Sequence, residues 1–416
     1  MKNQKTTLSS LLSKKRYDLY LKDPIHKEIN FSSEPWIAEF VYCPELVRLQ
    51  DIKQLGVSFK TFNSATHSRY MHSLGAFQVA QKFAKHFEKE ISTDDKKLFL
   101  IAALLHDIGH GPFSHVFEQI TNVNHEEMTR KIVTSDKLSI KKLLKKNKIS
   151  VNKLIDVYLG HYKQEWISKL ISSNLDVDRI DYLLRDSYHI GTYYASIDID
   201  YLIERSILSD TDICFYQTTK NYIESFLFGR YYMHLDIYDN KNSYIYLWSL
   251  KNVFERLKEI KELFEKHKNE IFYYDLYEWI VFEKEIDVEN YILLNDNNLT
   301  AFIDSLKCMK DKILDSFSSN FVLSTNEIIA INWTKENYEL VKNETKDSTI
   351  DKKYLYAVCE KNKKNIYTNG DKNSISIYNT YSKKIRKFDV KTLIEFNKGH
   401  KNHHNKIILI NKNLIN

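Results

Sequence analysis

The sequence predicts a mainly α-helical protein with a smaller α+β region at its C-terminal end. Apolar residues recur every three or four positions from Leu74 to Phe87, which is the period of an amphipathic helix. The unbroken apolar run Leu98–Leu105 predicts a second helix that is buried on most sides. Beyond about residue 320 the pattern changes, and the turn pair Asn369-Gly370 lies near short strand-like segments.

Composition bounds the class of protein. The chain has 416 residues, of which 43% are hydrophobic and 28% charged, as is ordinary for a soluble globular protein. Neither a membrane-spanning run nor the apolar core of a signal peptide is found, so we expect a cytoplasmic protein. Four widely spaced cysteines predict reduced, buried thiols. A net charge of +6 fits an anionic ligand without demanding one.

Further elements are expected along the chain. Residues 1–20 are polar and lysine-rich and predict a flexible arm. Pro44 in the first turn predicts a helix at Cys43–Leu49. The segment Lys137–Lys148 predicts an amphipathic helix with a basic, solvated face, and the alternative is a patch for phosphate or nucleic acid. Residues 220–270 predict more helices. Ile375–Tyr378 and Ile407–Ile410 predict strands.

The pair His106-Asp107 follows the buried run Leu98–Leu105 directly and is the first indication of chemistry. An imidazole nitrogen and a carboxylate oxygen together suit a divalent metal ion. The pair enters the interior, where an unpaired carboxylate is costly and a metal ion removes that cost. Glycines and a proline then break the helix, so that His110 and His115 fold back near the pair.

Two ligands do not hold an ion, so further ligands must come from elsewhere in the chain. The best candidates are His72, at the start of the Leu74–Phe87 helix, and Asp178. Two imidazoles and two carboxylates leave coordination positions free for water and a phosphate oxygen, as a catalytic site requires. Asp178, Tyr182 and Asp186 follow one another at intervals of four and share one helix face.

These motifs resemble a known family. With His106-Asp107, the blocks Arg48–Gly56, Ala65–Gly75 and Asp176–Asp186 occur in the order found in HD-domain metal-dependent phosphohydrolases. They resemble most the branch of the dNTP triphosphohydrolases, which contains the dGTPases and the sterile-alpha-motif HD proteins. The resemblance implies a helical HD catalytic core over residues 21–310, entered through a short strand or turn at Asp23–Ile29. An α+β region over residues 311–416 would follow.

The resemblance also implies roles for individual residues. His125 would be a catalytic acid oriented by Glu118, where relatives usually have Asp. His110 and His115 would surround the phosphate with it. The metal ligands implied are His72, His106, Asp107 and Asp178. The substrate-binding residues implied are Gln54, Tyr182 and Asp186 at the sugar, Arg69, Arg179 and Arg230 at the phosphates, and Tyr238.

Two departures from the family pattern bear on specificity. Arg179 stands where relatives often have Lys, and a forked guanidinium binds phosphate differently from an ammonium. Asn240 replaces a His in the pattern that begins at Tyr238.

The activity implied is hydrolysis of deoxynucleoside triphosphates to deoxynucleoside and triphosphate. It would require a divalent ion, for which Mn, Fe, Mg, Zn, Ni and Co all stay open. The alternatives are an HD phosphohydrolase or phosphodiesterase acting on another nucleotide or on nucleic-acid ends, and a non-catalytic nucleotide- or nucleic-acid-binding protein. Relatives suggest a homo-oligomer and a nucleotide activator. Nucleic acid is a possible partner that the sequence does not indicate, and we expect no membrane partner.

Overall fold

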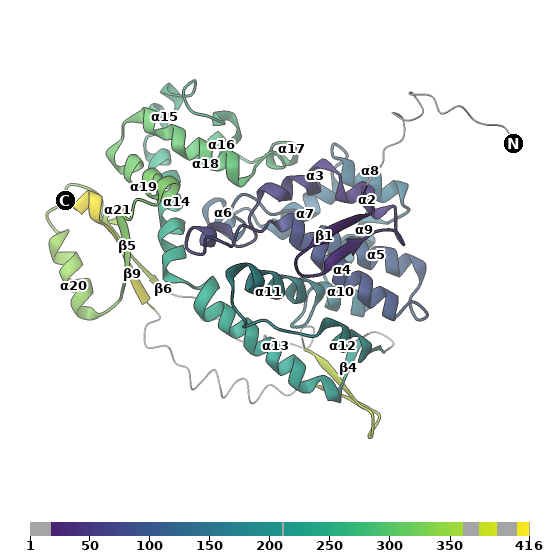
Figure 1. The fold of residues 1–416 in the computed structure, drawn as a ribbon. Coiled ribbons are helices and arrows are strands. Elements are labelled where there is room, and N and C mark those ends of the chain that lie inside the picture. The colour runs from purple at the N-terminus through teal and green to yellow at the C-terminus, as the bar shows by residue number, and fades with distance from the viewer. Residues whose placement is uncertain (1–17, 210–211, 361–373, 389–405, 416) are drawn as a thin grey trace.

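Helices dominate the computed structural model, which describes residues 18–209, 212–360, 374–388 and 406–415. The prediction of a mainly α protein is confirmed. In Figure 1 the helices of the N-terminal half, α2 to α10, gather on one side of the molecule, and the sheet of β5, β9 and β6 lies on the other. Helices α14 and α19 pack together between them, and α14 also contacts that sheet.

The N-terminal half begins with an antiparallel hairpin and continues with helices. The hairpin is β1 (Tyr20–Asp23) and β2 (Lys27–Asn30). The helices that follow are α2 (Ile37–Val41), α3 (Pro44–Val47), α4 (Arg69–His86), α5 (Thr93–Leu105), α6 (His115–Thr121), α7 (His125–Thr134), α8 (Ser139–Lys146), α9 (Val151–Tyr158), α10 (Glu165–Ile171), α11 (Val177–Ile190) and α12 (Ile199–Glu204).

The remainder of the described chain holds a second group of helices and two small sheets. Its helices are α13 (Lys220–Met233), the π-helix η4 (His234–Tyr238), α14 (Lys241–Glu259), α15 (Lys261–Lys266), α16 (Tyr274–Val281), α17 (Val288–Tyr291), α18 (Asp296–Ser305), α19 (Lys312–Leu323), α20 (Lys335–Glu344), α21 (Lys352–Leu355) and α23 (Lys412–Ile415). Its strands are β3 (Ser206–Leu208), β4 (Ile213–Tyr216), β5 (Ile328–Asn332), β6 (Tyr356–Glu360), β7 (Ser376–Asn379), β8 (Lys384–Lys387) and β9 (Lys406–Asn411).

Helix α4 lies against both α5 and α11, and these three helices form the frame of the N-terminal half. Helix α5 starts where the side chain of Ser92 accepts a hydrogen bond from the Asp95 backbone N–H, and the residues Leu98–Leu105 are at most 3% exposed. Each buried Leu, Ile or Phe side chain contributes about 1.5–3 kcal/mol. The summed contribution of these side chains exceeds the several kcal/mol that the burial of one ion costs. The burial of α5 can therefore offset the burial of Asp107, which follows the end of the helix.

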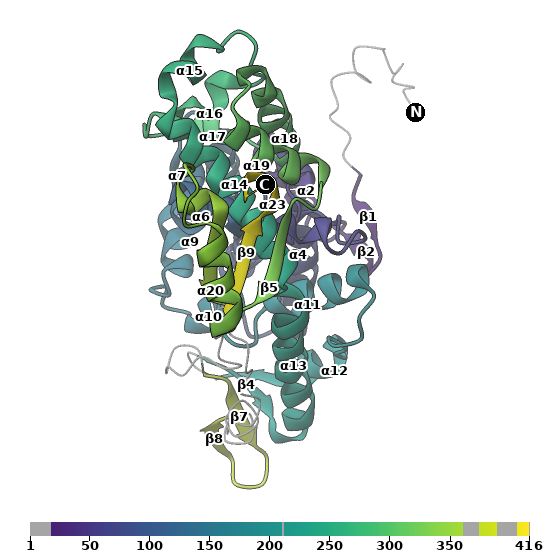
Figure 2. The same cartoon turned by 90° about the vertical axis from the view of Figure 1, so that its left-hand side faces the viewer.

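The sheets confirm two predicted strands. Ile375–Tyr378 corresponds to β7 and Ile407–Ile410 to β9. One sheet has the order β3-β4-β7-β8, in which β4 and β7 are parallel, and the other is antiparallel with the order β5-β9-β6. Figure 2 shows β7 and β8 projecting beyond the helices. The predicted turn at Asn369-Gly370 and most of the predicted arm over residues 1–20 lie outside the described residues.

The structure also tests the predictions about the cysteines and about membrane-spanning segments. All four cysteines are free, but only Cys43 and Cys214 are buried, whereas Cys308, in the 3-10 helix Leu306–Met309, and Cys359, in β6, are partly exposed. The prediction of four buried thiols was therefore half wrong. Within the described ranges, the structure has no helix with the length and apolar character needed to cross a membrane.

Candidate metal centre

Three helices bring four side chains to one point. His72 lies in the first turn of α4, His106 and Asp107 follow the end of α5, and Asp178 lies in the first turn of α11. His72 Nε2 is 3.2 Å from His106 Nε2 and 3.0 Å from Asp178 Oδ1. Asp107 places one oxygen 3.5 Å from His72 Nε2 and the other 3.4 Å from His106 Nε2. These separations suit the ligands of one ion with bonds of about 2.1 Å.

The charge of the four side chains also fits a cation. Burial raises the pKa of Asp107, but His106 and Arg69 outweigh burial and hold that pKa well below its usual range. Burial likewise raises the pKa of Asp178, and hydrogen bonds from His106 and His72 reverse the shift. Two ionised carboxylates beside two imidazoles form a mixed O/N donor set. These side chains could therefore hold a divalent metal ion, whose identity the donor set leaves open.

The second ring nitrogen of His72 meets a buried carboxylate. His72 Nδ1 lies 2.8 Å from Asp181 Oδ2, and His26 Nε2 lies 2.7 Å from Asp181 Oδ1. Arg185 donates two hydrogen bonds to Asp181, of 2.9 and 2.8 Å, and one of 2.7 Å to Asp23. The side chains of both carboxylates and of Arg185 are fully buried. The network makes Nδ1 of His72 a hydrogen-bond donor to Asp181 and turns Nε2 toward Asp178 and His106, where an ion would replace the Nε2 proton.

Replacement of Asp181 by Asn is expected to weaken metal binding by about 10–100-fold, the usual effect of losing a partner that orients a ligand. The reason is that Asn presents an N–H where His72 and Arg185 need an acceptor. Competition with a chelator measures the affinity. Asp95→Asn is the matched control, because Asp95 is also buried and bonded, to the Tyr162 hydroxyl at 2.7 Å, but lies at the far end of α5. Equal losses in both variants would mean general destabilisation and contradict the assignment.

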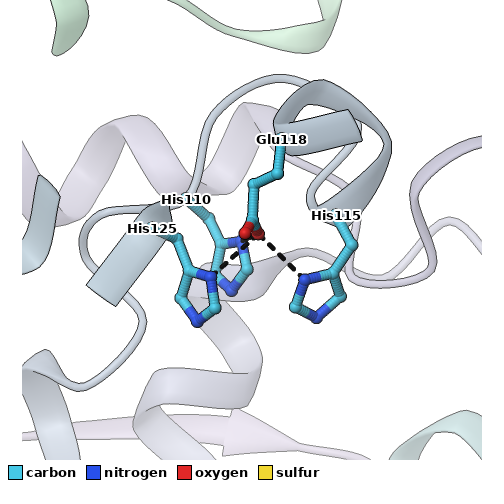
Figure 3. Close-up of side chains that lie close together, drawn as sticks. All are labelled: His110, His115, Glu118 and His125. Carbon is cyan, nitrogen blue, oxygen red and sulfur yellow. Dashed lines mark hydrogen bonds and ion pairs between the residues drawn. The ribbon is translucent and has the colours of Figure 1, made fainter. Parts of the chain in front are cut away.

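A second cluster lies beside the first and is formed by His110, His115, Glu118 and His125 (Figure 3). Glu118 Oε1 lies 2.8 Å from His125 Nδ1 and 2.9 Å from His115 Nδ1. The rings of His110 and His125 stack with centroids 4.0 Å apart. Burial raises the pKa of Glu118, but its hydrogen bonds to His115 and His125 hold it well below the usual range. Glu118 thus reaches His125 although relatives usually have the shorter Asp.

The loop between the two clusters is held in a strained conformation. Phe113 and Ser114 both have positive φ, at 54° and 58°, which costs of order 1–3 kcal/mol for each residue. The Phe113 N–H donates to Asp296 at 2.6 Å, and the Ser114 hydroxyl donates to the Lys53 carbonyl at 2.7 Å. Burial raises the pKa of Asp296 to about 6. These contacts hold the loop that carries His115 against the strain.

Gly109 is needed for the approach of α7. A Cβ atom on Gly109 would lie 2.1 Å from the carbonyl oxygen of His125 and 2.4 Å from the Thr129 nitrogen. Any side chain at this position would therefore push away the start of the helix that carries His125. Arg48 supports the same loop from the other side, because it donates hydrogen bonds of 2.7 and 2.8 Å to the carbonyls of Ile108 and His110.

The arginines predicted at the phosphates differ in their partners. Arg69 is 4% exposed and bonds to Asp107 and, at 2.7 Å, to Ser114 Oγ, so it supports the metal centre. Arg179 pairs with Asp176 at the start of α11, and its Nε is buried and has no hydrogen-bond partner among the residues that the structure describes. Arg230 in α13 has buried Nε and Nη1 groups without a partner in the described part of the chain. The last two arginines thus retain donors for an anion.

The residues predicted at the sugar are arranged around aromatic rings. The Tyr182 ring lies 6.3 Å from the rings of both His72 and Tyr238, measured between centroids. Asp186 is buried and accepts a hydrogen bond of 2.7 Å from the Tyr238 hydroxyl, and His67 lies at the same distance from its other oxygen. Gln54 is 9% exposed, and within the described ranges its Oε1 is buried without a hydrogen-bond partner. Asp186 therefore positions Tyr238.

Comparison with known proteins identifies the fold of this site. The model of the HD domain matches residues 69–186, which contain both clusters. A Mycoplasma pneumoniae protein described only as the homologue of MG461 is 31% identical over 408 residues, covering 91% of this chain and 94% of that protein. This chain belongs to the HD-domain family. Membership of the HD superfamily supports a hydrolase, and the donor set could hold a divalent metal ion.

Other relatives of this HD protein carry more specific names. The SAMHD1 homologue of Dictyostelium discoideum, a deoxynucleoside triphosphate triphosphohydrolase, is 26% identical over 356 residues, which cover 79% of this chain and 69% of that protein. The crystal structure of a Bacteroides thetaiotaomicron phosphohydrolase matches with a TM-score of 0.77 and 24% identity, covering 94% of this chain and 99% of that one. The second similarity shows the fold alone.

Sequence reasoning missed several residues of the HD centre. Asp181 lies three positions after Asp178 and so near the same helix face, a signal that spacing alone contained. His67, which stacks on His189 and contacts Asp186, had a weaker signal in its place within the Ala65–Gly75 block. The hairpin residues Asp23 and His26 lie in the predicted segment Asp23–Ile29, but nothing in the sequence indicated their contacts, because their partners lie more than 150 positions away.

Proposed function

We propose that this HD phosphohydrolase hydrolyses deoxynucleoside triphosphates to deoxynucleoside and triphosphate. The observation that carries the proposal is the set of buried N–H groups without acceptors on Arg179 and Arg230. A buried donor left without a partner costs about 1–3 kcal/mol, so such groups favour an anionic ligand that supplies the acceptors. Guanidinium groups bind phosphate oxygens in this way. The names of the SAMHD1 relatives support a triphosphate as that anion.

The metal ligands proposed are His72, His106, Asp107 and Asp178. A divalent ion bound there would polarise a phosphate oxygen and lower the pKa of a bound water. The carboxylates provide the negative charge that retains it, and Asp181 orients His72. Arg69 already donates hydrogen bonds to Asp107 and Ser114. In this proposal its main role is therefore to support the metal ligands, and its contact with a phosphate is secondary.

His125 supplies the proton in the proposed reaction. Glu118 engages Nδ1 of His125, which leaves Nε2 as the nitrogen that faces a reacting group. A water oxygen attacks the α-phosphorus and releases one proton to solvent, the bond from phosphorus to the 5′ oxygen breaks, and the proton on Nε2 passes to that oxygen. The products are the deoxynucleoside and intact triphosphate. His110 and His115 would stand beside the same phosphate.

A second candidate is hydrolysis of another phosphate ester by the same HD centre. Asn240, which replaces the His of the family pattern, caps α14 by accepting a hydrogen bond of 3.0 Å from the Asn242 N–H. Its amide also donates to the Asp236 carbonyl at 3.2 Å. Both polar groups of the Asn240 side chain are therefore used in hydrogen bonds to the backbone. Because Asn240 then does not replace the His of the family pattern as a phosphate contact, the site favours a substrate with fewer phosphates or a nucleic-acid end.

Product analysis tests the proposal. The protein is incubated with each dNTP and NTP, a nucleoside monophosphate and a short oligonucleotide, with Mn²⁺ or Mg²⁺, and the products are separated by chromatography. Deoxynucleoside and triphosphate in equal amounts are the expected products. Release of pyrophosphate or orthophosphate, or turnover of the oligonucleotide alone, would favour the second candidate. The predicted homo-oligomer and nucleotide activator are tested by repeating the assay with added nucleotides and by light scattering.

Tyr182→Ala is expected to lower the preference for dNTPs over NTPs by about 10-fold, since one crowded atom costs about 1–3 kcal/mol. The reason is that the Tyr182 ring, near His72 and Tyr238, would crowd a ribose 2′-hydroxyl. The ratio of kcat/KM for dGTP and GTP, and for dATP and ATP, measures the effect. Tyr182→Phe keeps the ring and should keep the ratio. An equal fall for both sugars in Tyr182→Ala would identify Tyr182 as a packing residue only.

A further inference from the structure

The cluster formed by His110, His115, Glu118 and His125 could also bind a metal ion. One nitrogen of each imidazole and one carboxylate oxygen all lie within 4.8 Å of one another. We propose that this cluster binds a second divalent cation of the Zn²⁺ class, and that the bound cation inhibits hydrolysis by withdrawing His125. The inhibition rests on the proposed function, in which His125 is the proton donor. The binding does not.

The geometry of the cluster is close to that of a tetrahedral zinc site. With bonds of about 2.1 Å, the ligand atoms of such a site are about 3.4 Å apart. Glu118 Oε1 lies 2.8, 2.9 and 3.8 Å from Nδ1 of His125, His115 and His110, and the three rings surround that carboxylate (Figure 3). Small movements of the half-buried Glu118 and the exposed His115 side chains would open a space for one ion between them.

His110 provides independent support for a ligand at this place. Its side chain is 1% exposed, and among the described residues neither ring nitrogen has a hydrogen-bond partner. Asp107 Oδ1 lies 3.4 Å from Nε2 but outside hydrogen-bond geometry. A buried polar atom without a partner costs about 1–3 kcal/mol. A cation on Nδ1, which points toward Glu118, would remove that cost.

The donor set selects the kind of ion. Three imidazoles and one carboxylate suit Zn²⁺, Co²⁺ or Ni²⁺, whereas Mg²⁺ takes oxygen ligands and retains its waters. The first centre has two nitrogens and two carboxylates, so it accepts harder ions as well. The two centres therefore differ in selectivity. With Mg²⁺ or Mn²⁺ alone the first centre fills and the second does not.

Binding at the second centre removes the proton donor. An ion that takes Nδ1 of His125 and Oε1 of Glu118 breaks the hydrogen bond by which Glu118 orients His125. It also occupies the space beside His110 that a phosphate needs. We therefore expect Zn²⁺ to lower kcat of the Mn²⁺-loaded enzyme at least about 100-fold, as loss of a general acid does.

The stoichiometry of Zn²⁺ on the full-length, untagged protein tests the site without any substrate. The wild type should bind two equivalents, and His106→Ala should keep the second. His115→Ala should weaken the second equivalent by at least about 10-fold, since even loss of a ligand's outer partner has that effect. His115 is 64% exposed, so its replacement leaves the packing intact. His161→Ala, at another exposed histidine, is the matched control.

Spectra and rates distinguish the possible failures. Co²⁺ added after Mg²⁺ should give the strong visible absorption of a tetrahedral site in the wild type and in His161→Ala, and a weaker band in His115→Ala. A single equivalent of Zn²⁺ in the wild type, or equal binding by His115→Ala, overturns the second site. Two equivalents without a fall in kcat overturn the inhibition alone. Two equivalents on a protein that turns over no dNTP support the site, while the proposed function fails.

Discussion

Replacing His106 or Asp107 by alanine is expected to remove both the bound metal and the hydrolysis. The two residues supply half of the proposed ligands, and their atoms lie 3.2–3.5 Å from His72 Nε2. Removal of Asp107 also leaves Arg69 buried without its carboxylate partner, which adds to the loss. Metal content of the purified variants by mass spectrometry and the rate with dNTP measure the two effects.

Controls separate this loss from unfolding. Asp200→Ala removes a 69% exposed carboxylate that pairs with Lys82, and it should retain both metal and activity. Helical circular dichroism of the His106→Ala and Asp107→Ala variants should match the wild type, because the apolar run of α5 supplies most of the local stability. Unchanged metal content in both folded variants would refute the ligand assignment.

His125→Ala is expected to leave the metal bound and to slow turnover by roughly 10²–10⁴-fold, the usual range for losing a general acid. The basis is the 2.8 Å contact between His125 Nδ1 and Glu118 Oε1, which orients the ring. Initial rates and metal content are measured on the same preparation.

Glu118→Gln provides a second variant for the same question. It keeps the size of the side chain but weakens the hold on His125, so it should reduce turnover less than His125→Ala does. Turnover near the wild-type rate in His125→Ala would transfer the acid role to His110 or to His115.

The helical frame could be predicted because its signals are local. The apolar run of α5 and the Ser92 cap define that helix within a dozen residues. Asp178, Tyr182 and Asp186 are four residues apart, which predicted that they share one face of α11, as they do in the structure. The family pattern named both histidine clusters, and the structure brings each of them together. That these residues bind metal and substrate stays a prediction.

What could not be predicted depends on contacts between distant segments. The family resemblance implied a sugar contact for Asp186, but only the tertiary structure shows that it bonds to His67 and Tyr238. The strand β7 was predicted from its composition, whereas its parallel pairing with β4, about 160 residues away, has no local signal. Asn240 was read as a departure from a motif, and the structure shows it as a helix cap.

The buried network around Asp181 sets an order of assembly for the chain. As synthesis proceeds, His72, His106 and Asp107 emerge well before Asp178 and before the carboxylate that orients His72. The hairpin residue His26 must wait for a partner 155 positions later. Contacts over such separations form slowly, since the intervening chain has to be ordered first. A nascent chain that ends at α5 would hold an ion weakly, and tight metal binding would report that the described chain from β1 to α11 has folded together.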